Sequence, residues 1–435
     1  MLGFWFIIGI AALVIIWSQR RRQQKFFAPD RLAQNMAVEI KAPPSLHPFI
    51  DTTQCIGCGS CVQACPEQNV LSLVNMKALL VQPDHCVGHG KCETACPVGA
   101  ITLVIGTHDN GVDVPVTDEF FETNVPGMYV VGELRGIGLI RNSLRQGMQC
   151  IDRIAAKPQR HRAAYDVIIV GAGPAGLGAT LQAAAKRMRY LTLEQEDIGG
   201  TILKYPRQKI VMTAPIHLPG YGKIHFRDVR KEDLLAAWQK IIATTGVQIH
   251  TKKRVEKISK TGTRFEVVAA GEKYSANHVL LALGRRGTPR QLGVPGEHLP
   301  KVIYQLDDPR EFAGRECLVV GGGDSALECA LMLAEAGAHV TLSYRQKNFT
   351  RAKSRNRQML AEAISNRRLR AWLPSQVKTI TPDAVRLEIN GVEKSIPNDA
   401  VIVMAGGILP FDFLKEIGIQ MRTLYGEPLP GKSIA

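Results

Sequence analysis

The sequence predicts an α/β protein with two doubly wound parallel-sheet units, a small cysteine-rich α+β domain and one N-terminal transmembrane helix. Three observations carry this prediction. An apolar run that leads into a glycine turn and a helix occurs twice, at residues 166–185 and 316–335. Seven of the ten cysteines lie between residues 55 and 96. Residues 2–17 are uncharged and almost wholly apolar. With 435 residues, 45% hydrophobic and 21% charged, the chain is long enough for several packed cores.

The N-terminal apolar run predicts a membrane anchor. As a helix, residues 2–17 would reach about 24 Å at roughly 1.5 Å per residue, which approaches a hydrocarbon core of about 30 Å. Positive charges follow the run, beginning at Arg20, whereas a cleaved signal peptide carries them before it. The positive-inside rule therefore predicts a single-pass anchor in the cytoplasmic membrane, with the later domains on the cytoplasmic side. A signal peptide and a buried helix are the alternatives.

The stretch DVIIVGAGPAGLGAT, at residues 166–180, has the order that a dinucleotide site needs. Gly171 permits the tight turn, Gly173 lets the backbone approach a pyrophosphate, and Gly176 allows close packing of helix and strand. The start of the helix offers free N–H groups to phosphates. A second apolar run ends in Glu194, 23 positions beyond Gly171, where a carboxylate can bind ribose hydroxyls. A glycine-rich turn without a ligand is the plain alternative.

The cysteines follow metal-ligand spacing. The run CIGCGSCVQACP has the C-x2-C-x2-C-x3-C-P pattern of bacterial iron–sulfur ferredoxins, in which the fourth thiolate crosses to the other cluster, and HCVGHGKCETACP repeats it. We therefore expect two [4Fe–4S] clusters. The crossing rule gives the first cluster Cys55, Cys58, Cys61 and Cys96, and gives the second Cys65, Cys86 and Cys92. Zinc is disfavoured because its sites pair C-x2-C halves across a longer gap.

The second run departs from the first at one position. His89 stands where the pattern expects a cysteine, so the second cluster has only three candidate thiolates. The sequence leaves three interpretations open: a four-iron cluster with His89 as a ligand, a three-iron [3Fe–4S] cluster, or a site that has lost its cluster. Cys150, Cys317 and Cys329 stand alone, and we expect buried free thiols at all three.

Beyond Glu194, the chain has Gly199 and Gly200, and then HVLLALGRRGTPRQLGVPGE at residues 278–297, whose buried strand ends at Gly284. With these stretches, residues 110 to 435 resemble the FAD-dependent pyridine nucleotide oxidoreductases, in particular the thioredoxin reductase-like branch. The resemblance implies two Rossmann-like domains. It also implies an FAD site at the first glycine turn, with Gly200 and Gly284 as further contacts.

The stretch ECLVVGGGDSALECALMLAEAGAHVTLSYR, at residues 316–345, repeats the strand, turn and helix. Gly321, Gly323 and Ala326 occupy its three small positions, and the resemblance implies that this second unit binds NAD(P)H. An NAD-specific site places an acidic residue about 20 positions further on. Here Arg345 stands at that place, with Arg351 close by, so NADPH is favoured over NADH.

Two departures from the family shape the functional prediction. Residues 299–316 contain no cysteine, although thioredoxin reductases carry a redox Cys-x-x-Cys pair there. The flavin-closing segment expected near the C-terminus instead resembles residues 123–154, with Gly132 and Glu133 at its Gly-Asp position. The chain therefore looks circularly permuted. A hairpin linker is the alternative, and donation of this segment to a neighbouring subunit of a homodimer stays open.

The predicted domain order follows from these segments. It is an anchor (1–19), a linker (20–47), a dicluster ferredoxin domain (48–106), a permuted FAD element (107–160), an FAD domain (161–285), an NAD(P) domain (286–397) and a return to the FAD domain (398–435).

We expect an enzyme that moves electrons between NAD(P)H, FAD and two iron–sulfur clusters, because a flavin links two-electron and one-electron carriers. The acceptor is not identified, and either direction of flow is open. A flavin-dependent reductase of a small disulfide and a non-catalytic redox sensor or assembly factor are the alternatives. The net charge of +15, with a basic concentration at residues 345–370, suits anionic lipid, an acidic redox protein or a nucleotide phosphate. A solvated basic helix face is the plain alternative. No nucleic-acid motif accompanies it, so nucleic acid is not an expected partner.

Overall fold

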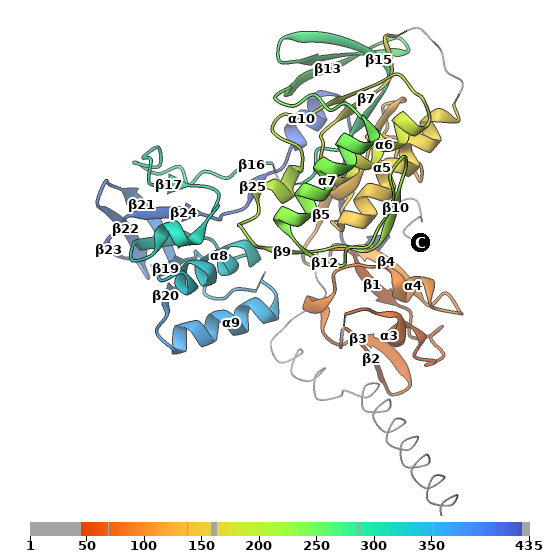
Figure 1. Ribbon diagram of the computed structural model, residues 1–435. Helices are drawn as coiled ribbons and strands as arrows, with labels where there is room; N and C mark the ends of the chain where they lie inside the picture. The colour runs from red at the N-terminus through yellow and green to blue at the C-terminus, as the bar shows by residue number, and fades with distance from the viewer. Residues whose placement is uncertain are drawn as a thin grey trace, which may run out of the picture. The chain divides into compact units, whose positions relative to one another are not determined.

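The computed structural model describes residues 45–67, 69–136, 138–157, 163–285, 287–350 and 352–428, and the chain forms two compact units (Figure 1). The first unit combines the cysteine-rich residues up to Val114 with the C-terminal residues from Thr423. The second unit comprises Pro115–Arg422. The chain passes between them in β5 (Val112–Pro115) and β26 (Met421–Leu424), which pair as two strands.

The first unit is a small α+β fold. Its elements are β1 (His47–Ile50), α3 (Ser60–Ala64), β2 (Leu71–Val74), β3 (Lys77–Leu80), the 3-10 helix η1 (Pro83–His85), α4 (Lys91–Thr94), β4 (Ile101–Ile105) and β27 (Glu427–Pro428). Strands β2 and β3 form an antiparallel hairpin. Strand β4 lies between β1 and β27, antiparallel to both, so the C-terminal strand completes the sheet of this unit.

The first half of the second unit is built on a six-stranded sheet. Its strands are β6 (Met128–Val130), β7 (Tyr165–Val170), β8 (Tyr190–Leu193), β13 (Val255–Thr261), β14 (Arg264–Ala269) and β15 (Glu272–Leu281). The C-terminal half of β15 runs parallel to β7 on one side and to β6 on the other. The N-terminal half of β15 pairs with β14 in an antiparallel ladder. The segment that carries β6 therefore enters the sheet of its own chain.

Successive side chains of β6 point to opposite faces of the sheet, and each face packs into its own hydrophobic core. Met128 and Val130 are buried in a cluster that includes Leu414 of α10 (Phe411–Glu416). Tyr129 belongs to the opposite cluster, which is covered by α5 (Ile140–Ala155) and α6 (Pro174–Ala185). This period of two is what a strand with both faces buried requires.

Helices α5 and α6 lie side by side (Figure 1) and approach at paired glycines. A methyl group added at Gly147 of α5 would overlap the Ala175 carbonyl oxygen of α6. A methyl group added at Gly178 of α6 would overlap the Leu144 carbonyl oxygen of α5. The close crossing holds α5 against the helix that begins at the first glycine turn.

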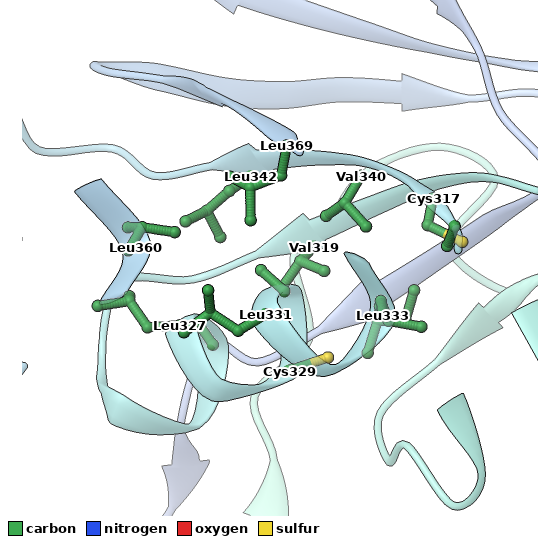
Figure 2. Packing of buried hydrophobic residues seen from close by; sticks show 14 of the residues in the cluster. Cys317, Val319, Leu327, Cys329, Leu331, Leu333, Val340, Leu342, Leu360 and Leu369 are labelled. Carbon is green, nitrogen blue, oxygen red and sulfur yellow. The ribbon is translucent and has the colours of Figure 1, made fainter. Parts of the chain in front are cut away.

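The second half of this unit has a five-stranded parallel sheet in the order β17 (Val302–Ile303), β24 (Ala400–Val403), β18 (Glu316–Val320), β19 (His339–Ser343) and β20 (Leu369–Trp372). Leu327 and Leu333 of α8 (Asp324–Glu335) and Leu360 of α9 (Ser354–Ser365) pack on one face of it (Figure 2). The antiparallel sheet of β21 (Ser375–Ile380), β22 (Ala384–Ile389) and β23 (Val392–Pro397) shares the core of the other face.

Smaller elements complete the second unit. They are η2 (Gly132–Arg135), η3 (Gly200–Lys204), β9 (Ile210–Met212), β10 (Ile216–Leu218), β11 (Gly222–Ile224), β12 (Asp228–Arg230), α7 (Lys231–Thr245), β16 (Thr288–Pro289), η4 (Pro309–Phe312) and β25 (Gly407–Ile408).

The expected return to the FAD domain at residues 398–435 is wrong in its extent. Strand β24 pairs with β17 and β18, so it belongs to the second sheet. Helix α10 joins the core of the first sheet, as expected, but β27 pairs with β4 in the cysteine-rich unit. A parallel strand such as β24 is apolar on both faces wherever it lies, so its sequence does not reveal its sheet.

No helix within the described part of the chain is both long and apolar enough to span a bilayer. The anchor predicted at residues 2–17 lies outside the described residues.

Candidate functional site

The first glycine turn connects β7 to α6 and lines a cavity of about 700 Å³ in the second unit. Gly171 has a φ of +104°, and a methyl group there would lie 2.6 Å from the Ala282 carbonyl oxygen. A methyl group at Gly176 would overlap the Gly171 carbonyl oxygen. Gly173 caps α6 at its N-terminus, and Pro174 occupies the first turn, where no N–H is needed. The remaining N–H groups of that turn suit a pyrophosphate.

Glu194, which directly follows β8, is buried and lines the same cavity. Its Oε2 accepts a hydrogen bond from the Ala172 N–H at 2.6 Å, and its Oε1 accepts one from the Glu196 N–H at 2.9 Å. Each oxygen keeps a second lone pair for a ribose hydroxyl. The structure therefore joins the predicted carboxylate to the predicted phosphate loop.

The displaced segment supplies another wall of the cavity. Gly132 and Glu133 line it where β6 ends. The buried Gly132 N–H donates to Oε1 of Gln146 at 2.9 Å, so α5 fixes the conformation of this turn. Gly200 and Gly284 line the cavity as well. Seven of the eight predicted FAD-binding residues thus line one cavity, and the eighth, Gly176, packs against the Gly171 turn.

The remaining wall of this cavity was missed by the sequence reasoning. Pro410 and Phe413 at the start of α10 line the cavity, as does Tyr205, which follows η3. In the sequence this part of the wall shows only a proline followed by a short amphipathic run, Phe411–Glu416, which does not by itself indicate a ligand contact. The volume lies within the range of about 300–1,000 Å³ that is usual for ligand sites, and the donor loop and carboxylate suit an FAD adenosine diphosphate.

The second glycine turn repeats the first. Gly323 caps the N-terminus of α8, and a methyl group there would contact nothing within 4 Å, which leaves room for a ligand. At Gly321, a methyl group would overlap the Met404 carbonyl oxygen and would lie 3.0 Å from Cβ of Ala326. Arg345 is exposed just beyond β19. Arg351 lies outside the described residues.

Two features of the second turn were not predicted. The ring of Tyr344 lies against Gly322 and stacks on Phe349 with a centroid separation of 5.5 Å. Oδ1 of Asp324 accepts hydrogen bonds from the Lys353 N–H at 2.8 Å and from Asn356 Nδ2 at 2.7 Å. The basic loop after β19 is therefore tied to the first turn of α8.

The cysteines of the first unit gather around two hollows. The first hollow is lined by all four candidates for the first cluster, Cys55, Cys58, Cys61 and Cys96. The second hollow is lined by Cys65, Cys86, His89 and Cys92. The structure therefore brings each predicted set together, with the crossing of Cys65 and Cys96 between the repeats.

The described residues contain no group of three or more His, Cys, Asp or Glu side chains at the spacing of a single metal ion. The Ala78 N–H donates to Cys55 Sγ at 3.4 Å, and the Ala100 N–H donates to Cys96 Sγ at 3.3 Å. Such donors stabilise cluster thiolates.

Burial opposes ionisation of these cysteines when they are free. It raises the pKa of Cys61 to about 11 and the pKa of Cys92 to about 12. Because a cluster binds thiolates, its assembly must displace these protons.

The three lone cysteines are buried and free, which confirms the prediction. Cys317 and Cys329 lie in the core between the second sheet and α8 (Figure 2). Burial raises the pKa of Cys317 to about 11 and the pKa of Cys329 further, which makes both thiols inert.

A two-dinucleotide flavoprotein with an iron–sulfur module is the class of protein that this fold and these sites define. Comparison with known proteins gives the family. Residues 168–429 match the pyridine nucleotide-disulphide oxidoreductases, and residues 47–97 match the 4Fe-4S dicluster domain. The chain belongs to the pyridine nucleotide-disulphide oxidoreductase family. The match begins after β6 and α5.

Individual relatives agree with this assignment. The chain is 32% identical over 263 residues to a ferredoxin–NADP reductase of Ignicoccus hospitalis, covering 59% of this chain and 82% of that one. It is 26% identical over 270 residues to the bacilliredoxin reductase Bdr of Bacillus subtilis, covering 60% and 82%. A solved bacillithiol disulfide reductase (Bdr, YpdA) of Staphylococcus aureus matches with a TM-score of 0.54 and 25% identity, covering 60% and 85%.

The expected enzyme class and cofactors are therefore confirmed. The chain is an FAD-dependent NAD(P)H oxidoreductase with a 4Fe–4S dicluster domain.

Proposed function

We propose that this enzyme moves electrons between NADPH and its own two [4Fe–4S] clusters, and between the clusters and a separate redox protein. The connection of the two units carries the proposal. The reductase unit is inserted into the ferredoxin unit, because β4 precedes it and β27, which pairs with β4, follows it. A reductase joined at both ends to a cluster-binding module keeps that module at a high effective concentration as an electron acceptor.

The residues of the second unit bind and orient the cofactors. When bound, FAD supplies the conversion between a two-electron hydride donor and one-electron carriers. The α6 N-terminus would hold its pyrophosphate, Glu194 its ribose, and the Gly132 turn its ribityl region. Arg345 would hold the 2′-phosphate of NADPH. No side-chain acid or nucleophile is needed for this chemistry.

The charges of the two units support the same proposal. Residues 45–114 contain six acidic and two basic side chains, whereas residues 115–422 contain 45 basic and 30 acidic ones. Opposite charge on two redox modules favours productive encounter and suppresses wrong pairings. The name of several relatives, ferredoxin–NADP reductase, contains the same pair of reactants. Electron transfer from the clusters to NADP⁺ is the same reaction in reverse.

An apolar edge beside the first hollow supports exchange with a separate protein. Cys58 is exposed, and Ile56, which also lines this hollow, is 62% exposed. Met76, whose backbone neighbours Gly57, is 58% exposed. Adjacent exposed apolar side chains are a common feature of protein docking sites.

The test is anaerobic reduction of the purified full chain by NADPH, followed by EPR. The wild type should show reduced-cluster signals, and Cys58→Ser should lose those of the first cluster while its flavin is still bleached. Cys317→Ala, which alters a buried thiol outside both hollows, is the matched control and should behave as the wild type does. Flavin bleaching without any cluster signal in the wild type would refute the proposal.

A second candidate function is reduction of a small disulfide directly at the flavin. Its support is the names of two relatives, bacilliredoxin reductase and bacillithiol disulfide reductase. In this case turnover of the disulfide would persist in Cys58→Ser at the wild-type rate. The described lone cysteines are buried, so such a substrate would have to reach the flavin itself.

We also propose that residues 2–17 anchor the enzyme in the cytoplasmic membrane, with both units on the cytoplasmic side. Support comes from the apolar run and from the arginines that follow it. Membrane fractions washed with alkaline carbonate should retain the full chain. Release into the wash would contradict the anchor.

A further inference from the structure

Cys58 in the first cysteine repeat and His89 in the second lie in the same backbone conformation, each between two glycines with positive φ. Cys58 stands between Gly57 and Gly59, with φ of +71° and +74°, and Gly59 caps α3. His89 stands between Gly88 and Gly90, with φ of +74° and +80°, and Gly90 caps α4.

The two loops are also alike in how they pack against neighbouring backbone. A methyl group at Gly57 would overlap the Met76 carbonyl oxygen, and one at Gly88 would lie 2.7 Å from the Leu46 carbonyl oxygen. Both loops are therefore pressed against neighbouring backbone in a conformation that favours glycine. The fold thus directs His89 to the corner of the second hollow that Cys58 occupies in the first.

The second hollow contains the partners that such a ligand needs. Cys65, Cys86 and Cys92 line it together with His89. Glu67 also lines it, and its Oε1 lies 3.9 Å from Nε2 of His89. Histidines that bind metal usually donate their other ring N–H to a carboxylate or carbonyl, which fixes the ring orientation.

Glu67 is the less suitable fourth ligand. It follows Pro66, and the equivalent residue after Pro97 in the other repeat is Val98, which has no ligating group. Imidazole nitrogen suits iron and replaces cysteine in known iron–sulfur sites, whereas a carboxylate is a harder donor.

We propose that the imidazole of His89 is the fourth ligand of a four-iron cluster in the second hollow, and that Glu67 positions it. The second cluster then has three thiolates and one neutral nitrogen, so it carries one negative charge less than the first. Replacement of thiolate by imidazole raises the reduction potential. A single electron added to the chain should therefore reside on the second cluster.

The assignment rests on the proposed function only in that the chain assembles two clusters. Its test uses dithionite, which supplies electrons without NADPH or FAD, so failure of the ligand assignment and failure of NADPH-driven transfer are distinguishable.

The experiment is pulsed EPR on the dithionite-reduced full chain, with natural-abundance and ¹⁵N-labelled histidine. The wild type should contain iron for two four-iron clusters and show a strong nitrogen coupling that changes with the label. His89→Cys should lose this coupling, keep its iron, and lower the potential of one cluster only. His85→Ala, beside Cys86, is the matched control and should keep the coupling. Glu67→Gln should keep the coupling with an altered magnitude.

Four results would overturn the assignment. They are the absence of a histidine coupling in the wild type, its persistence in His89→Cys, a three-iron signal in the oxidised wild type, and iron for only one cluster. The wild-type measurements decide the question even if His89→Cys does not assemble.

Discussion

The hydrogen bond between Gln146 and Gly132 gives a direct test of the displaced flavin wall. Gln146→Met keeps the length of the side chain but removes the acceptor of the buried Gly132 N–H, now at 2.9 Å. An unsatisfied buried donor costs about 1–3 kcal/mol. We expect the turn to open and hydrate this N–H in the FAD-free variant, so that the cost falls on the FAD-bound form. FAD should therefore bind about 5- to 150-fold more weakly.

Gln149→Met is the matched control on the same helix. Oε1 of Gln149 is buried and has no hydrogen-bond partner among the described residues, so its removal leaves no donor without an acceptor. Both variants would be stripped of FAD and titrated with FAD by quenching of flavin fluorescence, with urea unfolding as a check on the fold. Equal FAD affinities for the two variants would refute the role of the Gly132 turn in the site.

Three further substitutions test the ribose site, the 2′-phosphate site and the crossing of α5 and α6. Glu194→Gln replaces the charged acceptor expected to bind the ribose hydroxyls by a neutral amide and should weaken FAD binding about 10- to 150-fold. Glu266→Gln, which alters an exposed ion pair, should not weaken it, and equal effects would count against the ribose site. Arg345→Ala should raise the KM for NADPH about tenfold and leave that for NADH unchanged, while Lys378→Ala changes neither; a parallel rise for both cofactors would remove Arg345 from the 2′-phosphate site. Gly147→Ala places a methyl group on the Ala175 carbonyl oxygen and should lower the free energy of unfolding by about 1–3 kcal/mol, so an unchanged urea midpoint would contradict the close helix crossing.

The parts of the fold that could be predicted are those with local signals. Gly171 and Gly321 have positive φ, which favours glycine, and each directly follows a strand, β7 or β18, as the sequence predicts. The cysteine spacing also predicted which side chains share a hollow, because the crossing of Cys65 and Cys96 follows from the repeat itself.

The rest depends on pairing between distant residues. Strand β27 is two residues long and carries no strand pattern, so its place beside β4 is set by hydrogen bonds across more than 300 residues of chain. Tyr344 follows β19, and its ring contact with Gly322 depends on the turn that follows a different strand, β18. Neither relation has a local signature.

In the proposed function, electrons pass within one chain between NADPH and the clusters. The most direct measurement is anaerobic stopped-flow bleaching of the clusters after mixing with saturating NADPH, over a tenfold range of enzyme concentration. We predict a first-order rate that does not change with enzyme concentration. A rate proportional to enzyme concentration would indicate transfer between molecules. A flavin that is reduced while the clusters stay oxidised would exclude transfer to the clusters.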